Sequence, residues 1–205
     1  MTYLTVININ ETRPLWWKME NDLEALHAMV EKSVPNDSGR VLWRLDKDTG
    51  KNGDVLIIKS DTVPDATGIV EQFGWPRLAY DDQVKTADMS RFYGSLAEGQ
   101  RFHFRIAVNP SKQDSSSKKR YPLVGRNALN WTTGKLENGG FIVHSIEQKA
   151  ESSPRLMKNG RPIFVKTTHY IGVVEVADPV KAVKTLEDGI GRYKAYGDGL
   201  MTLTR

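Results

Sequence analysis

The sequence predicts an α+β protein made of two successive domains with the same order of elements. Strand-like and helix-like segments follow one another as β-α-β-β-α-β in the N-terminal half, and this order recurs in the C-terminal half. The order is typical of the ferredoxin-like plan. We therefore expect tandem ferredoxin-like domains over residues 1–80 and 98–205, joined by a linker over residues 81–97.

The first domain is predicted to hold four strands and two helices. Residues 2–9 alternate apolar and polar side chains as a strand does. Apolar residues then recur at helical spacing over residues 19–33, and Pro35 ends that helix. The other predicted elements are strands at 41–45, 55–58 and 75–80, and a short helix at 65–73.

The second domain begins with the clearest strand pattern in the chain. In residues 101–108 four apolar side chains alternate with polar ones, and Asn109-Pro110 ends the strand. Asp178 is a suitable N-cap for a helix that runs to residue 188, because Pro179 then occupies the first helical position. The other predicted elements are a polar loop at 111–120, a helix at 123–137, a strand at 141–148, two extended segments flanking Gly160 and ending near Val176, and a final strand at 200–203.

Composition restricts the class of protein. The 205 residues include 39% hydrophobic residues, enough for a core, and no cysteine. The absence of cysteine excludes disulfides, thiolate zinc sites and thiol nucleophiles, and it fits a reducing cytoplasm. The N-terminus lacks the basic region and cleavage site of a signal peptide, and no apolar run approaches the roughly 20 residues of a membrane span. We expect a cytoplasmic protein with no membrane partner.

Positive charge is concentrated in the second half of the chain. Residues 1–97 hold 11 Lys/Arg and 15 Asp/Glu, whereas residues 98–205 hold 18 and 10. Such asymmetry indicates binding to nucleic acid or to another acidic surface. The cations predicted to contact phosphates cluster in two turns and in a glycine-rich segment: Lys112, Lys118, Lys119, Arg120, Arg155, Lys158, Arg161, Lys166, Arg192 and Lys194.

A glycine-rich segment precedes the last strand. It contains Gly189, Gly191, Gly197 and Gly199, which allow close approach of the backbone to a ligand or to other backbone. Two cations and two tyrosines lie between the glycines, and these residue types bind phosphates and stack on bases. The alternative is structural: a glycine that caps a helix, followed by a turn into the last strand.

Several local signatures occur in one order along the chain: Leu26-His27, Leu42-Trp-Arg-Leu-Asp46, Pro64-Asp65, Phe104-Arg-Ile-Ala-Val-Asn-Pro110, Lys118-Lys-Arg-Tyr-Pro-Leu123, Trp131, and the glycine-rich segment Gly189 to Leu200. This arrangement resembles the CRISPR-associated CasE family over essentially the whole chain. The resemblance implies tandem ferredoxin-like domains. It also implies an endoribonuclease that cuts CRISPR repeat RNA at the 3′ base of a hairpin without metal or cofactor. The mature guide RNA would stay bound, together with the other subunits of the type I-E surveillance complex.

By this resemblance, His27 occupies the position of the family's catalytic histidine. In metal-free cleavage the ribose 2′-OH attacks the adjacent phosphate. Histidine suits the proton transfers of this reaction because its unperturbed pKa is about 6.5. Carboxylates at 20, 24 and 31 share its flank of the helix and favour the imidazolium, so we expect His27 to act as the acid for the leaving oxygen. One position departs from the family pattern, since Glu24 stands where the family often has a tyrosine.

The other histidines and tryptophans have simpler interpretations. His103 and His144 fall in strands, where structural roles are expected, and His169 adjoins a lysine in an extended segment. The three tryptophans at 43, 75 and 131 are interpreted as core, and those at 16 and 17 as packing around the first helix, with stacking on RNA as the alternative.

Two other functions remain open from the residues alone. The chain could be a non-catalytic subunit that binds the RNA hairpin, with an idle His27. It could also be a general RNA-recognition module, although the Arg/Lys-Gly-aromatic signature of that class is missing. The sequence contains no Gly-x-x-x-x-Gly-Lys-Ser/Thr loop, no His-Glu-x-x-His and no Gly-x-Ser-x-Gly, which argues against the corresponding enzyme classes.

Overall fold

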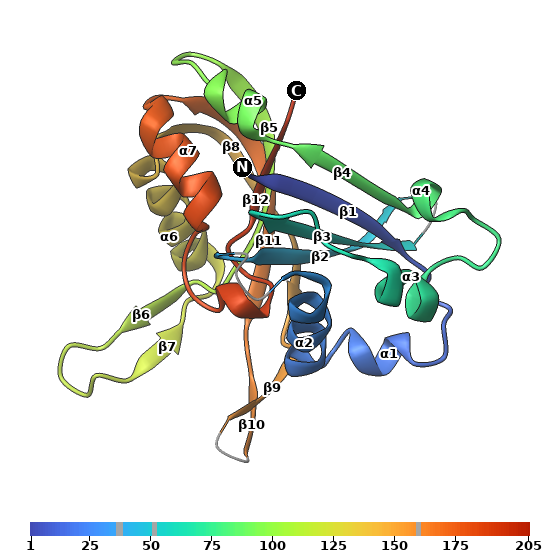
Figure 1. Cartoon of the computed structure of the whole chain (residues 1–205). Helices are drawn as coiled ribbons and strands as arrows, with labels where there is room; N and C mark the ends of the chain where they lie inside the picture. Colours follow the sequence, from blue (N-terminus) through green and yellow to red (C-terminus); the bar gives the residue numbers. More distant parts are fainter. Residues whose placement is uncertain (36–38, 51–52, 159–160) are drawn as a thin grey trace. The chain divides into compact units, whose positions relative to one another are not determined.

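The computed structural model describes residues 1–35, 39–50, 53–158 and 161–205, and it confirms the predicted α+β class (Figure 1). Within these residues there are two four-stranded antiparallel sheets, each in its own compact unit. Unit 1 consists of Met1–Gly94, Pro154–Ile163 and Ala195–Gly197, and unit 2 of Ser95–Ser153, Phe164–Lys194 and Asp198–Arg205. The units are therefore not two continuous stretches of chain, because short segments from the C-terminal half complete unit 1.

Unit 1 is built on a sheet with the strand order β2-β3-β1-β4. Its elements are β1 (Tyr3–Ile9), α1 (Trp16–Met19), α2 (Leu23–Ser33), β2 (Leu42–Gly50), β3 (Gly53–Ser60), α3 (Thr67–Phe73), α4 (Tyr80–Gln83), β4 (Val84–Asp88) and α5 (Ser90–Gly94). Helices α2 and α3 lie on the same face of the sheet (Figure 1). Three apolar side chains of α2, namely Leu23, Leu26 and Val30, are buried there, as their helical spacing predicts.

Three expectations for the first half of the chain need correction. Residues 75–80 do not form a strand; they form a turn that leads into α4, and the fourth strand is β4, at 84–88. In β4 only the first residue, Val84, is buried, so the strand has no apolar alternation for a sequence pattern to detect. Residues 81–97, expected as a linker, hold α4, β4 and α5. The helix predicted over 19–33 is also shorter, because Asp22 caps α2 and separates it from α1.

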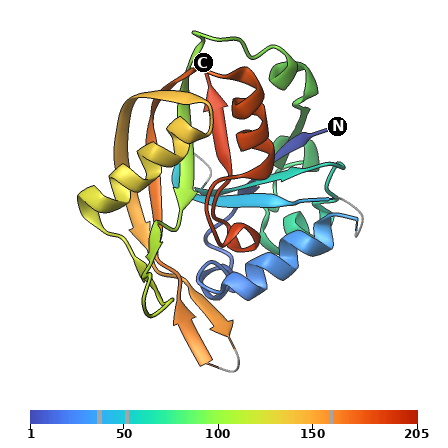
Figure 2. The same cartoon turned by 90° about the vertical axis from the view of Figure 1, so that its left-hand side faces the viewer.

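Unit 2 repeats the arrangement with the strand order β12-β5-β11-β8. Its elements are β5 (Arg101–Val108), β6 (Ser111–Gln113), β7 (Arg120–Pro122), α6 (Gly125–Asn138), β8 (Phe141–Ser152), β11 (Thr167–Val176), α7 (Pro179–Asp188), the 3-10 helix η1 (Lys194–Tyr196, whose last two residues count with unit 1) and β12 (Met201–Thr204). Helices α6 and α7 cover one face of this sheet (Figure 2). Strand β5 has the predicted bounds, and its four apolar side chains are all buried.

The ends of α7 also confirm the sequence pattern. The Asp178 carboxylate accepts a hydrogen bond of 3.0 Å from the Lys181 N–H, and Pro179 begins the helix. The expected polar loop at 111–120 is instead a hairpin of β6 and β7, whose side chains are mostly exposed. Strands β9 (Arg155–Lys158) and β10 (Arg161–Phe164) flank the predicted turn, and Gly160 itself lies outside the described residues.

The interpretation of the tryptophans is correct in part. Trp16 and Trp43 are buried, Trp75 and Trp131 are half-buried, and Trp17 is 62% exposed. The expectation that Trp17 packs around the first helix is therefore wrong. Among the described residues no helix has both the length and the apolar character that a membrane span requires.

A carboxyl group is fully buried in unit 2. Asp198 Oδ2 accepts a hydrogen bond of 3.3 Å from the Thr167 hydroxyl, and Oδ1 has no hydrogen-bond partner among the described residues. Burial raises the pKa of Asp198 well above its usual value, and the single hydroxyl donor offsets this only in part. Asp198 therefore favours the neutral acid in the folded protein.

This carboxyl makes stability depend on pH in a defined direction. Because the folded state keeps the Asp198 proton at pH values where the unfolded chain has released it, the free energy of unfolding falls as pH rises above about 4. We expect Asp198→Asn to have a higher Tm than wild type at pH 8, with the difference shrinking as pH approaches 4. Thermal unfolding followed by circular dichroism between pH 4 and 8 measures this.

The matched control is Asp178→Asn. The Lys181 N–H lowers the pKa of Asp178, so its stabilisation is present above about pH 4 and is lost as pH falls below it. Its effect should therefore have the opposite sign. If the Tm of Asp198→Asn followed that of wild type in parallel across the range, the buried carboxyl would not be protonated.

Candidate active site

The helix that carries His27 begins at a well-formed N-cap. Asp22 Oδ1 accepts hydrogen bonds of 3.2 Å from the N–H groups of both Glu24 and Ala25. These contacts satisfy two of the N–H groups that have no partner within the helix. The first turn of α2 is therefore fixed just before the histidine.

The same carboxylate holds the β9–β10 hairpin. Asp22 Oδ2 lies 2.8 Å from Nη2 of Arg155, and the Arg155 N–H donates to the Asn21 carbonyl at 3.0 Å. Burial raises the pKa of Asp22, but the hydrogen bonds from Arg155 and Ala25 outweigh it and leave the pKa below its usual value. Arg155, predicted to bind RNA, is thus engaged with the N-terminus of α2, where the hairpin meets the helix (Figure 2).

His27 lies one turn into α2 and is one-third exposed. Its Nδ1 is buried and lies 3.9 Å from Oε1 of Glu31, too far for a hydrogen bond. The ring of Tyr196 packs against the imidazole, with the two centroids 5.4 Å apart and the planes at 59°. His27 therefore combines access to solvent with a ring orientation that neighbouring side chains restrict.

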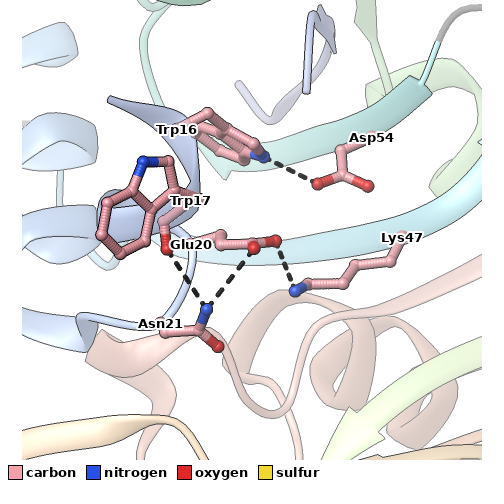
Figure 3. Close-up of polar contacts among 6 residues, drawn as sticks. All are labelled: Trp16, Trp17, Glu20, Asn21, Lys47 and Asp54. Carbon is pink, nitrogen blue, oxygen red and sulfur yellow. Dashed lines mark hydrogen bonds and ion pairs between the residues drawn. The ribbon is translucent and has the colours of Figure 1, made fainter. Parts of the chain in front are cut away.

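The carboxylates expected around His27 are not equivalent. Glu31 lies beside the imidazole, whereas Glu20 forms an ion pair with Lys47 on β2 and accepts a hydrogen bond from Asn21 (Figure 3). Figure 3 also shows the indole of Trp16 donating to Asp54 at 2.8 Å, which anchors α1 to β3. Glu20 is thus used to fix the junction of α1 and α2.

The glycine-rich segment adopts the backbone conformations that glycine permits. Gly189 ends α7 with φ of +70°, so the structural alternative describes this position correctly. A Cβ on Gly197 (φ +91°) would lie 2.8 Å from Cζ3 of Trp43, and one on Gly199 (φ +91°) would lie 2.5 Å from the Ile190 carbonyl oxygen. Both positions therefore require glycine for close packing within the protein.

The sequence did not predict the roles of Trp43 and Tyr196 at this site: Trp43 was interpreted only as core, and Tyr196 only as a ring on which a base could stack. The indole N–H of Trp43 donates to the Ala195 carbonyl at 2.9 Å, and Tyr196 follows directly. In the sequence, Trp43 has the pattern of an ordinary core residue, and Tyr196 is one of two tyrosines in a loop. Only the fold brings Tyr196 to His27, because Trp43 holds the preceding residue from the other end of the chain.

The predicted phosphate-binding cations differ in their contacts within the protein. Arg155 pairs with Asp22, Lys166 lies 2.7 Å from Glu151, and Lys194 donates to the Asp188 carbonyl at 2.7 Å. Arg120 donates a weaker hydrogen bond of 3.3 Å to Oε1 of Gln113. The exposed cations are Lys112, Lys118, Lys119, Arg120, Arg155, Arg161 and Arg192. The side chain of Lys158 lies outside the described part of the chain.

Four of the exposed cations share the β6–β7 hairpin. Its serine-rich turn is organised by Asp114, whose Oδ1 accepts hydrogen bonds from the hydroxyls of Ser116 at 2.6 Å and Ser117 at 2.9 Å. These hydrogen bonds lower the pKa of Asp114 to about 2. The turn thus has a defined shape, which holds Lys118, Lys119 and Arg120 at the surface of unit 2.

The remaining histidines have other environments. His144 Nε2 lies 2.9 Å from Oε2 of Glu175, and the same oxygen binds Arg101 at 2.7 Å. His103 is exposed on β5, and His169 is half-buried on β11. Among residues 1–35, 39–50, 53–158 and 161–205 no group of three or more His, Asp or Glu side chains is placed to hold a metal ion.

Comparison with known proteins extends over the whole chain. A family model described as "CRISPR associated protein" matches residues 2–205. The chain is 28% identical to the CRISPR-associated endoribonuclease Cse3 of Thermus thermophilus, over 87% of this chain and 86% of that protein. It is 24% identical to the CRISPR system Cascade subunit CasE of Escherichia coli, over 89% and 92%. A solved structure of Thermus thermophilus Cse3 bound to an RNA representing a pre-cleavage complex is similar, with a TM-score of 0.80, 25% identity and coverage of 100% and 99%.

The double role of Asp22 leads to a stability prediction. Asp22→Ala removes the N-cap acceptor and the partner of Arg155, and loss of an N-cap costs about 1 kcal/mol. For a chain of this size that lowers Tm by roughly 2–4 °C. Asp22→Asn keeps a capping oxygen and loses only the charge, so its Tm should fall less. Thermal unfolding at pH 7 separates the two variants, and equal Tm values for wild type and Asp22→Ala would contradict the role of the cap.

Proposed function

Since this chain belongs to the CRISPR-associated CasE family, we propose that it is a metal-independent endoribonuclease that processes CRISPR precursor RNA. It cuts at the 3′ base of the repeat hairpin and retains the mature guide RNA as a subunit of a type I-E surveillance complex. The observation that carries the proposal is the environment of His27, a partly exposed histidine that packs against the ring of Tyr196 and has the Glu31 carboxylate 3.9 Å from its Nδ1.

The architecture agrees with this proposal. Each unit has the element order β-α-β-β-α-β once the additional short elements are set aside, and each sheet places its first and third strands at the centre. Both helices of each unit lie on one face of its sheet (Figures 1 and 2). These features support the assignment of both units as ferredoxin-like domains in tandem.

Cleavage requires two proton transfers and a change of bonding at one phosphorus. The 2′-hydroxyl gives its proton to a base while the 2′-oxygen forms a bond to the adjacent phosphorus. The bond from phosphorus to the 5′-oxygen breaks, the 5′-oxygen takes up a proton, and a 2′,3′-cyclic phosphate remains. We assign to His27 the proton that passes to the departing 5′-oxygen. The Glu31 carboxylate lies 3.9 Å from Nδ1 of this imidazole.

The exposed cations supply the attraction for RNA. The β6–β7 hairpin presents four of them on unit 2, and phosphate contacts of this kind give affinity without sequence specificity. The deep, narrow major groove of A-form RNA excludes side chains, so base recognition belongs to the end of the hairpin or to the flanking single strand. Strong phosphate binding is also consistent with retention of the product.

The proposal is tested with end-labelled repeat-hairpin RNA in EDTA. We expect cleavage at one position, and we expect a single 2′-deoxy substitution at that position to abolish it. His27→Ala should lower the single-turnover rate about 10²–10⁴-fold, the range typical of a positioned acid or base, while the Kd for the RNA stays similar. His103→Ala, at an exposed histidine of unit 2, is the control and should cleave as wild type does.

The outcomes separate the alternatives. Tight binding without cleavage by wild type would identify a non-catalytic subunit that binds the hairpin. Cleavage that survives His27→Ala would retain the nuclease and assign the proton transfer to another residue. Cleavage that requires an added divalent cation would contradict the metal-independent mechanism.

A second test concerns the β6–β7 hairpin. The double variant Lys119→Ala/Arg120→Ala should weaken RNA binding in low salt and reduce the slope of log K against log salt concentration by roughly one for each lost phosphate contact. Lys181→Ala/Lys184→Ala removes the same charge from α7, where both lysines pair with aspartates, and should leave the slope nearly unchanged. Equal effects of the two double variants would mean that net charge, and not the hairpin, attracts the RNA.

A further inference from the structure

The buried Nδ1 of His27 has no hydrogen-bond partner among the described residues. A histidine in an active site commonly has one ring nitrogen bound to a carboxylate or carbonyl, and that bond fixes the ring. Here Nδ1 is buried without a partner among the described residues, and the Glu31 oxygen at 3.9 Å is beyond hydrogen-bond range. Some other contact must therefore restrict rotation of the ring.

Tyr196 provides that contact. Its ring centroid lies 5.4 Å from that of His27, with an angle of 59° between the planes, within the range of favourable aromatic packing. When the imidazole is protonated, the ring of Tyr196 also attracts it as a cation. We infer that Tyr196 is a positioning residue that holds His27 in its reactive orientation, an inference that rests on the nuclease function proposed above.

Tyr196 is itself held on both sides. The carbonyl of the preceding residue, Ala195, accepts the hydrogen bond of 2.9 Å from the Trp43 indole. The following residue, Gly197, lies so close to the same indole that a Cβ would approach Cζ3 to 2.8 Å. Trp43 is only 2% exposed and sits in β2 opposite Ile58 of β3, so the indole has a fixed position in the sheet.

This arrangement explains a requirement of the glycine-rich segment. Gly197 has φ of +91°, which a residue with a side chain rarely adopts, and it packs directly on the indole of Trp43. The positive φ and the close packing of Gly197 hold residues 195–197 against Trp43, and in this position the Tyr196 ring contacts His27. We therefore assign Gly197 a part in orienting the tyrosine, which does not require contact with RNA.

The consequence for cleavage is geometric. General acid catalysis requires the donor within hydrogen-bond reach of the departing oxygen, and a displacement of about 1 Å costs on the order of 10²-fold in rate. Loss of the Tyr196 ring removes a restraint on the imidazole but leaves the exposed cations of unit 2 unchanged. The defect should therefore appear in the rate of cleavage and leave RNA affinity intact.

The experiment compares Tyr196→Phe, Tyr196→Leu and Tyr80→Leu with wild type in single-turnover cleavage of saturating repeat-hairpin RNA. Tyr196→Phe keeps the ring and should stay within about threefold of wild type, whereas Tyr196→Leu should fall about 10²-fold with a similar Kd. Tyr80→Leu removes a partly exposed tyrosine from α4 and should cleave as wild type does. Full activity of Tyr196→Leu, or an equal loss in Tyr196→Phe, would overturn the inference.

A second readout does not depend on cleavage. The ring current of Tyr196 shifts the imidazole C–H resonances of His27, so Tyr196→Leu should move them towards the values of an unpacked histidine, and Tyr196→Phe should not. Resonances that are unchanged in Tyr196→Leu would show that the ring does not restrain His27. If wild type binds the RNA without cutting it, the proposed function fails while these spectra still decide the role of Tyr196.

Discussion

The hydrogen bond from the Trp43 indole to the Ala195 carbonyl spans 152 residues of sequence, and the candidate site depends on it. It fixes residues 195–197 within unit 1, although the residues on either side of them belong to unit 2. The bond is buried at its donor end, where an unpaired N–H would be costly, so it has a strong preference for one geometry. That geometry determines the position of the Tyr196 ring, and the Tyr196 ring packs against the imidazole of His27 and orients it.

The elements whose bounds the sequence predicted most closely have one buried face and one solvated face. Strand β5 and helix α7 have such faces, and their predicted bounds agree with the structure. Strand β4 and the β6–β7 hairpin lack a buried face, so they carry no apolar period and were missed. The false strand at 75–80 contains apolar residues around Pro76, but this stretch forms a turn because proline cannot donate to a strand ladder.

For the site, the sequence identified residue types and the structure assigned their partners. His27 was identified because it lies on an amphipathic helix and because the resemblance of the chain to a family assigns that position to the catalytic histidine. Arg155 looked like a free cation in a basic turn, but it pairs with Asp22, which lies 133 residues away. A count of charges cannot anticipate such a pair, since the opposing carboxylate lies in the half of the chain with net negative charge. The contact of Tyr196 with His27 was missed for the same reason, because these two residues are also remote in sequence.

The choice of neighbour at His27 has an electrostatic consequence. At 4 Å two unit charges interact by about 1 kcal/mol in water and about 4 kcal/mol near a protein surface, whether they attract or repel. A carboxylate within hydrogen-bond range would therefore fix the imidazole, but it would also repel the RNA phosphate on which the imidazole acts in the proposed mechanism. Glu31 stands farther off and is half-exposed, so its field is weakened by water. The Tyr196 ring restrains the imidazole without a formal negative charge. Orientation and access for an anionic substrate are thereby satisfied at the same residue.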